Sequence, residues 1–225
     1  MKTCKQYREQ AWSALQGKWA EAVLMMLVIY VISGVINMPS SIFSTFETYG
    51  LDISLPSFLI FTVSGVCAVA SILILGPLEW AYVNAILDDA IREKEWHIFP
   101  TSWKLFKREF AAFVPAYVLV FIIILLLAIP TLLIGSIIFS LAYAMVPFVI
   151  HDNPNIGVVE ALRTSRLMMR GHKAKLFLLN LSFIGWIILG ILSFGIGMLW
   201  ISPFMSTAQA AFYEDIRNAE PTTDL

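Results

Sequence analysis

The chain has 225 residues, of which 59% are hydrophobic and 14% are charged, and its mean hydropathy is +0.78. About a quarter of the residues in soluble domains are charged, so this composition excludes an ordinary soluble domain and predicts an all-α, polytopic membrane protein. The formal net charge of -1 leaves no basic excess to neutralise phosphates, so we exclude nucleic acid as a partner.

The positions of the cations predict how the chain crosses the membrane. All 15 Lys and Arg lie in three groups or at Arg217, and the intervening tracts without a cation are residues 19–91, 109–162 and 176–216. Because cation-rich loops stay in the cytoplasm, each tract must cross the bilayer an even number of times, and two crossings fit each length. We therefore expect a single integral membrane domain over residues 1–225 with cytoplasmic termini and about six transmembrane helices in three hairpins, near residues 20–80, 113–150 and 176–213.

The first hairpin follows a polar segment, residues 3–18, that we expect to form an amphipathic cytoplasmic helix. Its aromatic residues, including Tyr7 and Trp12, suit the headgroup region of a bilayer. The hairpin then divides at INMPSSIFSTFETYGLDISLPS, where turn formers and acids occur without any base, as in an external loop.

The second hairpin follows a similar interfacial segment that contains Trp103, Phe106 and Phe110. The motif AIPT divides its apolar tract and predicts an external turn at Pro130. At the other end of the tract, we interpret the polar pair His151-Asp152 as the point where the fourth span meets the interface.

The third hairpin follows the most basic segment of the chain. Asn153-Pro154 predicts a helix start and Gly171 a helix stop, and Arg163, Arg166 and Arg170 recur on this helix at spacings that share one face. Such a row beside apolar residues suits a helix at the membrane surface with its guanidinium groups on lipid phosphates. The alternative is that these cations only orient the following span. The lipid-headgroup hypothesis covers the following residues: Arg163, Arg166, Arg170, His172, Lys173 and Lys175.

Few polar residues lie inside the predicted spans, and the candidate intramembrane polar residues are Glu79, Asn84, Asn180 and Gln209. A carboxylate within a span indicates a proton, ion or substrate path, although Glu79 could equally emerge at the cytoplasmic surface of a long helix. In the last hairpin, SFGIG at 193–197 predicts a turn. Glycines and serines around it predict close helix packing, with Asn180 bonded across the contact.

No motif for catalysis or for a cofactor occurs in the sequence. The chain lacks H-E-x-x-H, Walker and G-x-S-x-G motifs, and its two cysteines, Cys4 and Cys67, have no metal-ligand spacing. Pro77 precedes Asp88-Asp89 by the spacing that separates Pro203 from Glu214-Asp215, a weak repeat that chance also produces. We expect no enzyme, no cofactor and no metal site.

Several motifs resemble a known family. The run SRLMMRGHKAKLFLLNLSFIGWIILGILSFGIGMLWISPF, followed by AFYEDI, is similar to the C-terminal part of the bacterial integral membrane proteins called domain of unknown function 975, and HDNP, LGPLEWAYV and KLFKREF also match. Trp80 and Thr131 stand where that family usually carries glycine. The resemblance implies a multi-pass protein of the bacterial inner membrane and supplies no catalytic residues.

The sequence therefore favours a non-enzymatic membrane module that binds anionic lipid or a membrane partner, including a second copy of itself, through its cytoplasmic basic helices. The alternative is a small transporter or channel that uses Glu79, Asn84 and the last hairpin. A lipid-handling enzyme is a third hypothesis, which has only the Arg row and His172 in its favour and lacks a nucleophile paired with a base.

Overall fold

The computed structural model describes residues 2–48, 57–92, 97–128 and 134–219, and every regular element within these ranges is a helix. The elements are α1 (Cys4–Leu15), α2 (Trp19–Thr48), α3 (Ser57–Ile86), the π-helix η1 (Leu87–Ile91), α4 (Ile98–Ala128), α5 (Ile134–Tyr143), α6 (Val146–Asp152), α7 (Val158–Met168), α8 (Lys173–Leu181), α9 (Ile184–Leu192) and α10 (Met198–Ala219). The predicted all-α class is confirmed.

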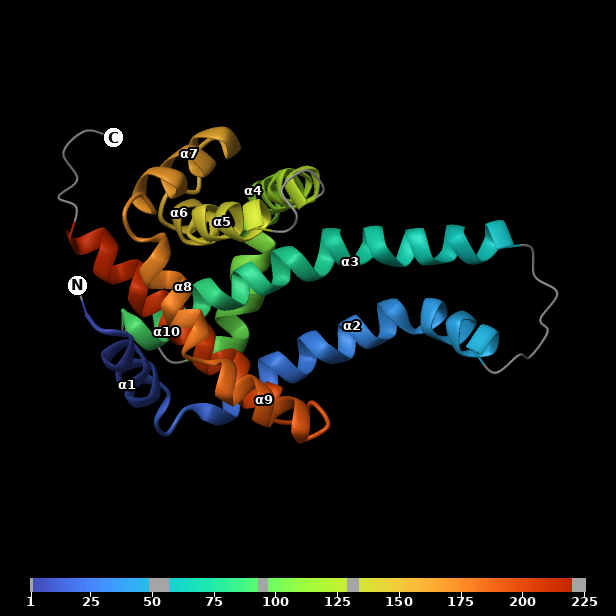
Figure 1. Cartoon of the computed structure of the whole chain (residues 1–225), viewed down its shortest axis with the longest axis horizontal. Helices are drawn as coiled ribbons and strands as arrows, with labels where there is room; N and C mark the ends of the chain where they lie inside the picture. The colour runs from blue at the N-terminus through green and yellow to red at the C-terminus, as the bar shows by residue number, and fades with distance from the viewer. Residues whose placement is uncertain (1, 49–56, 93–96, 129–133, 220–225) are drawn as a thin grey trace.

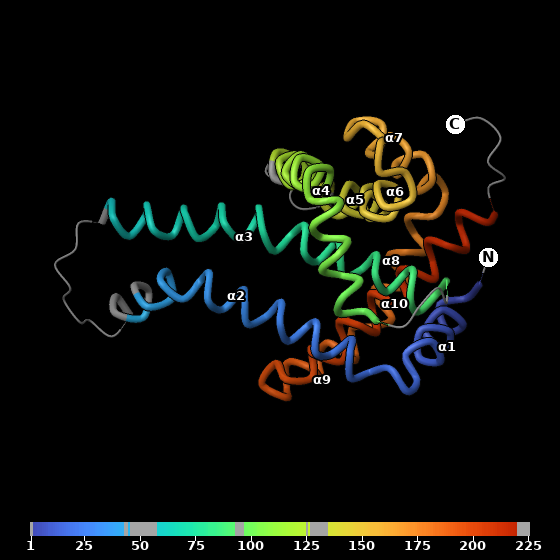
Figure 2. The backbone as a smooth tube through the Cα atoms, turned by 180° about the vertical axis from the view of Figure 1, so that it is seen from behind, coloured from blue at the N-terminus to red at the C-terminus, as the bar shows by residue number. Residues whose placement is uncertain are grey.

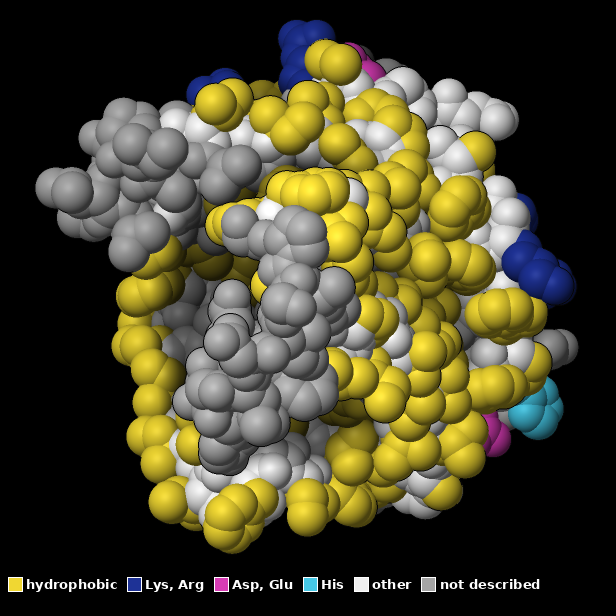
Figure 3. All heavy atoms as spheres, turned by 90° about the vertical axis from the view of Figure 1, so that its right-hand side faces the viewer, with side chains coloured by type: hydrophobic (Ala, Val, Ile, Leu, Met, Phe, Trp, Pro, Cys, Tyr) yellow, Lys and Arg dark blue, Asp and Glu magenta, His cyan; other side chains and the backbone are white. Residues whose placement is uncertain are grey.

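The long helices α2 and α3 run beside each other and extend from one side of a body that the other helices form (Figure 1). α1 and the end of α10 lie at the opposite side of this body. Seen from behind, α4 crosses α3 near the point where α2 and α3 leave the body (Figure 2). The side that faces right in Figure 1 is hydrophobic over most of its described surface, with charged side chains only near its edges (Figure 3).

Four stretches of described helix are long and apolar enough to cross a membrane: Trp19–Ile42, Phe58–Ile91, Gly135–Asp152 and Lys173–Leu192. On the first two, large apolar side chains such as Val35 and Phe61 are 66% and 79% exposed. Apolar side chains in such numbers suit a hydrocarbon surrounding better than water, which supports the membrane class.

Local sequence accounts for the first helix. Thr3 and Gln6 form a capping box, in which each side chain accepts a hydrogen bond from the backbone N–H of the other residue. Tyr7, Ala11 and Leu15 recur at a spacing of four and are buried, so they form the face of α1 that packs on α10. Gly17 follows in the left-handed region, with φ of 75°, and ends the helix.

α10 lies at the centre of the body, with Phe204, Phe212 and eight of its other residues buried. It contacts α1, α2, α3 and η1, which come from the first half of the chain. α3 and α4 approach closely at Gly76, where a Cβ atom would lie 2.5 Å from the Tyr117 ring. Trp80 packs edge-on against the same ring and against Phe113, so this contact forms with tryptophan at position 80.

Several predicted boundaries are wrong. Residues 36–48 are helical and belong to α2, and the following helix continues through η1 to Ile91 and not only to residue 80. Asn153 does not begin a helix but caps the end of α6, and α7 begins at Val158 after Gly157. The predicted turn at Pro130 lies outside the described residues. The predicted turn at 193–197 is confirmed, with Phe194 and Gly195 at positive φ.

Candidate functional site

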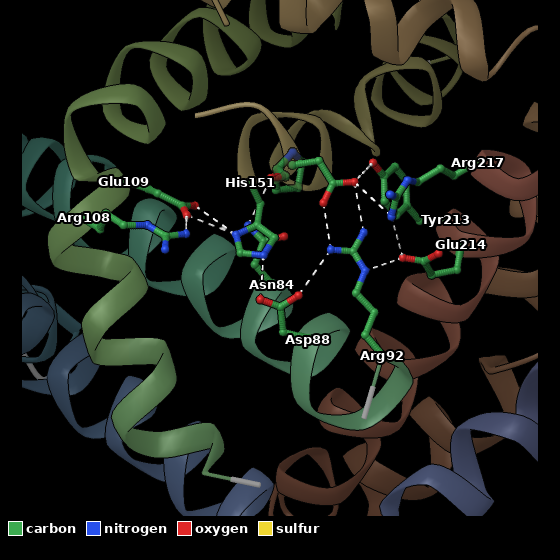
Figure 4. A network of polar contacts seen from close by, with 11 residues as sticks. Asn84, Asp88, Arg92, Arg108, Glu109, His151, Tyr213, Glu214 and Arg217 are labelled. Carbon is green, nitrogen blue, oxygen red and sulfur yellow. Dashed lines mark hydrogen bonds and ion pairs between the residues drawn. The ribbon is translucent and has the colours of Figure 1, made fainter. Parts of the chain in front are cut away.

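A network of charged side chains joins the ends of three helices that lie far apart in the sequence (Figure 4). η1 extends α3 and supplies Asp88 and, directly after it, Arg92. α6 ends with Asp152, α10 carries Glu214 five residues before its end, and α4 adds one more carboxylate. We call this set the ion network, and its members are Asp88, Arg92, Arg108, Glu109, His151, Asp152, Tyr213, Glu214 and Arg217.

Arg92 is the centre of the network. Its Nη1 and Nη2 atoms lie 2.8 and 3.0 Å from the two carboxylate oxygens of Asp152, its Nε atom lies 2.5 Å from Glu214 Oε1, and its Nη1 atom also lies 3.2 Å from Asp88 Oδ1. The side chain is only 13% exposed. Burial opposes its charge, but the hydrogen bonds that it donates to Asp152 and Glu214 outweigh that effect and raise the pKa of Arg92.

His151 links the other half of the network. Its Nε2 atom lies 2.9 Å from Asp88 Oδ2, and its Nδ1 atom lies 3.1 Å from Glu109 Oε1. Ionised carboxylates only accept hydrogen bonds, so both ring nitrogens donate, which requires the positively charged imidazolium. Arg108 also contacts the Glu109 carboxylate. With both nitrogens occupied, His151 is not available as a general base.

Two residues of α10 complete the set. The Tyr213 hydroxyl donates to Asp152 Oδ2 at 2.7 Å, and Arg217 Nη1 lies 3.2 Å from Glu214 Oε1 and 3.5 Å from Asp152 Oδ2. Each carboxylate of the ion network therefore faces at least one cation. A largely buried network satisfied in this way favours one arrangement of its helix ends, because losing a cation leaves buried carboxylates with fewer partners.

Sequence reasoning missed this network, although a signal was present. The dipeptides Asp88-Asp89, His151-Asp152 and Glu214-Asp215 begin at positions 88, 151 and 214, so that each follows the previous one by 63 residues. The proline spacing identifies only the outer two dipeptides, and His151-Asp152 by itself resembles an interfacial pair. The equal spacing places an acid near the end of each of three helices, namely η1, α6 and α10.

A second polar contact ties α1 to α10. The Tyr7 hydroxyl donates to Asp215 Oδ2 at 2.5 Å, and the backbone N–H of Lys2 donates to the same oxygen at 3.0 Å. Burial tends to raise the pKa of Asp215, but the hydrogen bonds from Tyr7 and Lys2 prevail and hold it below its usual range.

The structure places the predicted Arg row on the surface. Arg163, Arg166 and Arg170 are exposed, and among them the structure shows an ion pair only for Arg163, whose Nη1 atom lies 3.9 Å from Glu160. α7 ends at Met168, so Arg170 lies in the turn beyond the helix and not on its face as predicted. Gly171, at φ of 78°, ends this turn as expected. We call Arg163, Arg166 and Arg170 the basic surface.

The remaining residues of the lipid hypothesis begin α8. His172 is the N-terminal cap residue of that helix, Lys173 borders an apolar groove between α5 and α8, and Lys175 lies over the Tyr7 ring at 5.8 Å. The structure therefore divides the predicted group. Lys175 contacts α1, whereas Lys173 lies at the edge of the groove.

Of the intramembrane candidates, Glu79 is exposed on α3 and lines a cavity of about 290 Å³ between α2, α3 and α10. Tyr30, Ser202 and Ser206 also line this cavity, and the Tyr30 and Ser202 hydroxyl oxygens are 3.4 Å apart. Asn180 and Gln209 meet, since Gln209 Nε2 donates to Asn180 Oδ1 at 3.2 Å across the α8 and α10 contact. Asn84 is fully buried and donates to the Pro147 carbonyl at 3.0 Å.

A family model described as "Protein of unknown function (DUF975)" matches residues 106–220. No curated protein matches, and no solved structure matches. Within the described ranges, no group of three or more His, Cys, Asp or Glu side chains is arranged to hold a metal ion.

Proposed function

The chain belongs to the DUF975 family, whose description names no activity, and we propose that it is a non-enzymatic, multi-pass protein of the bacterial cytoplasmic membrane that binds anionic lipid through its basic surface. Six crossings with cytoplasmic termini underlie this proposal. Four correspond to the apolar helices, and the charge-free second half of α4 and the first part of α10 would supply the other two.

The observation that carries the proposal is the separation of the two signs of charge. The carboxylates of Asp88, Glu109 and Asp152 are turned inward and paired within the ion network. The guanidinium groups of the basic surface are turned outward, with Glu160 as the acid beside them. The chain is nearly neutral overall, yet this surface is positive, which suits an anionic leaflet.

Orientation of the following span does not require the basic surface. Lys173 and Lys175 lie at the start of α8 and already satisfy the bias that keeps that end in the cytoplasm. A cation near an anionic leaflet contributes about 1 kcal/mol, so three together could raise local lipid occupancy on the order of a hundredfold at low salt.

The test replaces Arg163, Arg166 and Arg170 with Gln and keeps Lys173 and Lys175. Native mass spectrometry of the protein released from mixed phosphatidylglycerol and phosphatidylcholine nanodiscs then measures retained lipid. The matched control carries Gln at Lys5, Lys104 and Lys107, which are exposed cations of α1 and α4. We expect the first variant to lose retained phosphatidylglycerol and the control to keep it. Equal retention by both variants and the parent would refute the proposal.

A second candidate function is transport, which the cavity beside Glu79 favours. A carboxylate that shares a cavity with Tyr30 and three serines between three helices is the arrangement expected of an intramembrane proton or cation site. Flux of protons or cations into proteoliposomes that contain the parent, compared with Glu79→Gln, tests this candidate.

A further inference from the structure

An apolar groove of about 340 Å³ lies between α5 and α8, two helices that belong to different candidate membrane-crossing stretches. Its walls are Ile137, Ile138 and Leu141 from α5 and Lys173, Ala174 and Phe177 from α8. Its volume falls in the range of roughly 300–1,000 Å³ that is typical of small-molecule pockets. The two helices lie beside each other in Figures 1 and 2.

The groove has a cationic end and a hydrocarbon end. α8 begins at Lys173 and runs on to Phe177, so the cation lies at the start of this wall. On the other wall, Leu141 is followed by Ala142, whose carbonyl accepts a hydrogen bond of 2.9 Å from Ser165 of α7. Arg166, a member of the basic surface, is the next residue along α7. The α7 side of the groove is therefore the basic side.

From this polarity we infer that the groove holds one acyl chain of an anionic phospholipid, with the phosphate at the Lys173 ammonium group. The inference rests on the proposed lipid-binding function and assigns it a single bound lipid, in addition to the loosely held lipids at the basic surface. Lys173 can line the groove with its aliphatic stem while its charged end stays at the headgroup level.

The shape of the walls favours an acyl chain over a helix of another protein. Helices that associate in membranes approach through Gly, Ala, Ser or Thr, which allow close backbone contact. Five of the six groove side chains are large, namely Ile137, Ile138, Leu141, Lys173 and Phe177. Branched and aromatic side chains of this kind leave a channel that a flexible hydrocarbon chain fills.

Two kinds of variant separate the acyl chain from the headgroup. Ala174→Trp and Ile137→Trp fill the groove from opposite walls, and Ala111→Trp adds the same bulk at an exposed position of α4 as the matched control. Lys173→Gln removes the cation and leaves the walls. All variants keep Arg163, Arg166 and Arg170, so that a loss of lipid does not arise from the basic surface.

The readout is native mass spectrometry of each variant after release from nanodiscs with equal phosphatidylglycerol and phosphatidylcholine, at increasing collision energy. We expect the parent and Ala111→Trp to keep one phospholipid at the highest energy, and both groove-filling variants to lose it. In Lys173→Gln, the ratio of phosphatidylglycerol to phosphatidylcholine in the last retained lipid should fall about fivefold. This factor corresponds to about 1 kcal/mol for the loss of one cation.

The inference is overturned if the groove-filling variants keep the last lipid as the parent does. It is also overturned if glycerol phosphate, added in millimolar excess, displaces that lipid, because the headgroup alone would then account for binding. The triple Gln variant of the basic surface distinguishes the two proposals. If it retains all the lipid of the parent while the groove variants lose the last one, lipid binding at the basic surface fails and the groove site stands.

Discussion

Arg92 and Asp152 form a two-pronged salt bridge, with Nη1 to Oδ1 at 2.8 Å and Nη2 to Oδ2 at 3.0 Å. The pair joins the end of η1 to the end of α6, although 60 residues separate the two in the sequence. Both side chains are mostly buried, with 13% and 15% exposed, so water compensates poorly for the loss of either partner. This bridge makes the positions of the two helix ends depend on each other.

Replacing Arg92 should therefore unfold the protein more readily. In Arg92→Leu, the carboxylates of Asp152 and Glu214 lose their main cation, and we expect a loss of about 3 kcal/mol in the free energy of unfolding. Thermal unfolding in mild detergent measures it. Arg163→Leu, an exposed control, should change stability by less than about 0.5 kcal/mol. A stable Arg92→Leu variant would mean that the ion network does not hold the helix ends.

The contact between Tyr7 and Asp215 predicts a dependence on pH. The pKa of Asp215 is lowered in the folded state, so its contribution is complete above about pH 5 and is lost as the pH falls through the folded-state pKa. Tyr7→Phe removes the 2.5 Å hydrogen bond and should cost about 1 kcal/mol at pH 7. Unfolding curves from pH 7 down to pH 2 should show parent and Tyr7→Phe converging in acid. A constant difference at every pH would contradict the assignment.

Two glycines of α3 allow a matched comparison of helix packing. At Gly76 an added Cβ atom would lie 2.5 Å from the Tyr117 ring, whereas at Gly65 nothing lies within 4 Å. Gly76→Ala should therefore destabilise the contact between α3 and α4 by about 1–3 kcal/mol. Gly65→Ala should be neutral or stabilise the helix by up to about 1 kcal/mol. Thermal unfolding of both variants measures the two changes in stability. Equal changes would argue against close contact at Gly76.

The cavity beside Glu79 predicts that the charge matters more than the shape of this side chain if transport takes place there. Glu79→Gln keeps the shape, and we expect it to abolish coupled flux while the unfolding temperature stays within a few degrees of the parent. Ser40→Ala in α2, outside the cavity, is the control. Unchanged flux in Glu79→Gln would remove the transport candidate.

Cysteine labelling checks the proposed topology. In a background with Cys4→Ser and Cys67→Ala, the variants Gly50→Cys and Leu167→Cys should react with an impermeant maleimide from opposite sides of the membrane. This result follows if residue 50 is external and the α7 region is cytoplasmic. Reaction of both cysteines from one side would show that the chain between them does not cross as proposed.

Local sequence patterns determined the membrane class and the approximate places of the helices. Hydropathy over about 20 residues, a capping box at Thr3 and glycine at 195 act within a few turns of helix, so they can be recognised along the chain. The exact limits of α2, α3 and α7 could not be predicted. Beyond residue 80, the continuation of α3 into η1 is mostly buried against α6 and α10, and local signals do not encode such contacts. The meeting of Asn180 with Gln209 likewise required the packing of α8 on α10.

Only the tertiary structure decided which polar residues belong together. Asp88, His151 and Glu214 each occur near the end of a different helix, and the charge pattern of the sequence is equally consistent with three separate interfacial ends. The packing of α10 against α3 and η1, and of α6 against α3 and α4, brings these ends together around Arg92. Because the energy of an ion pair depends on distance and burial, the role of these residues follows from helix packing and cannot follow from their order in the chain.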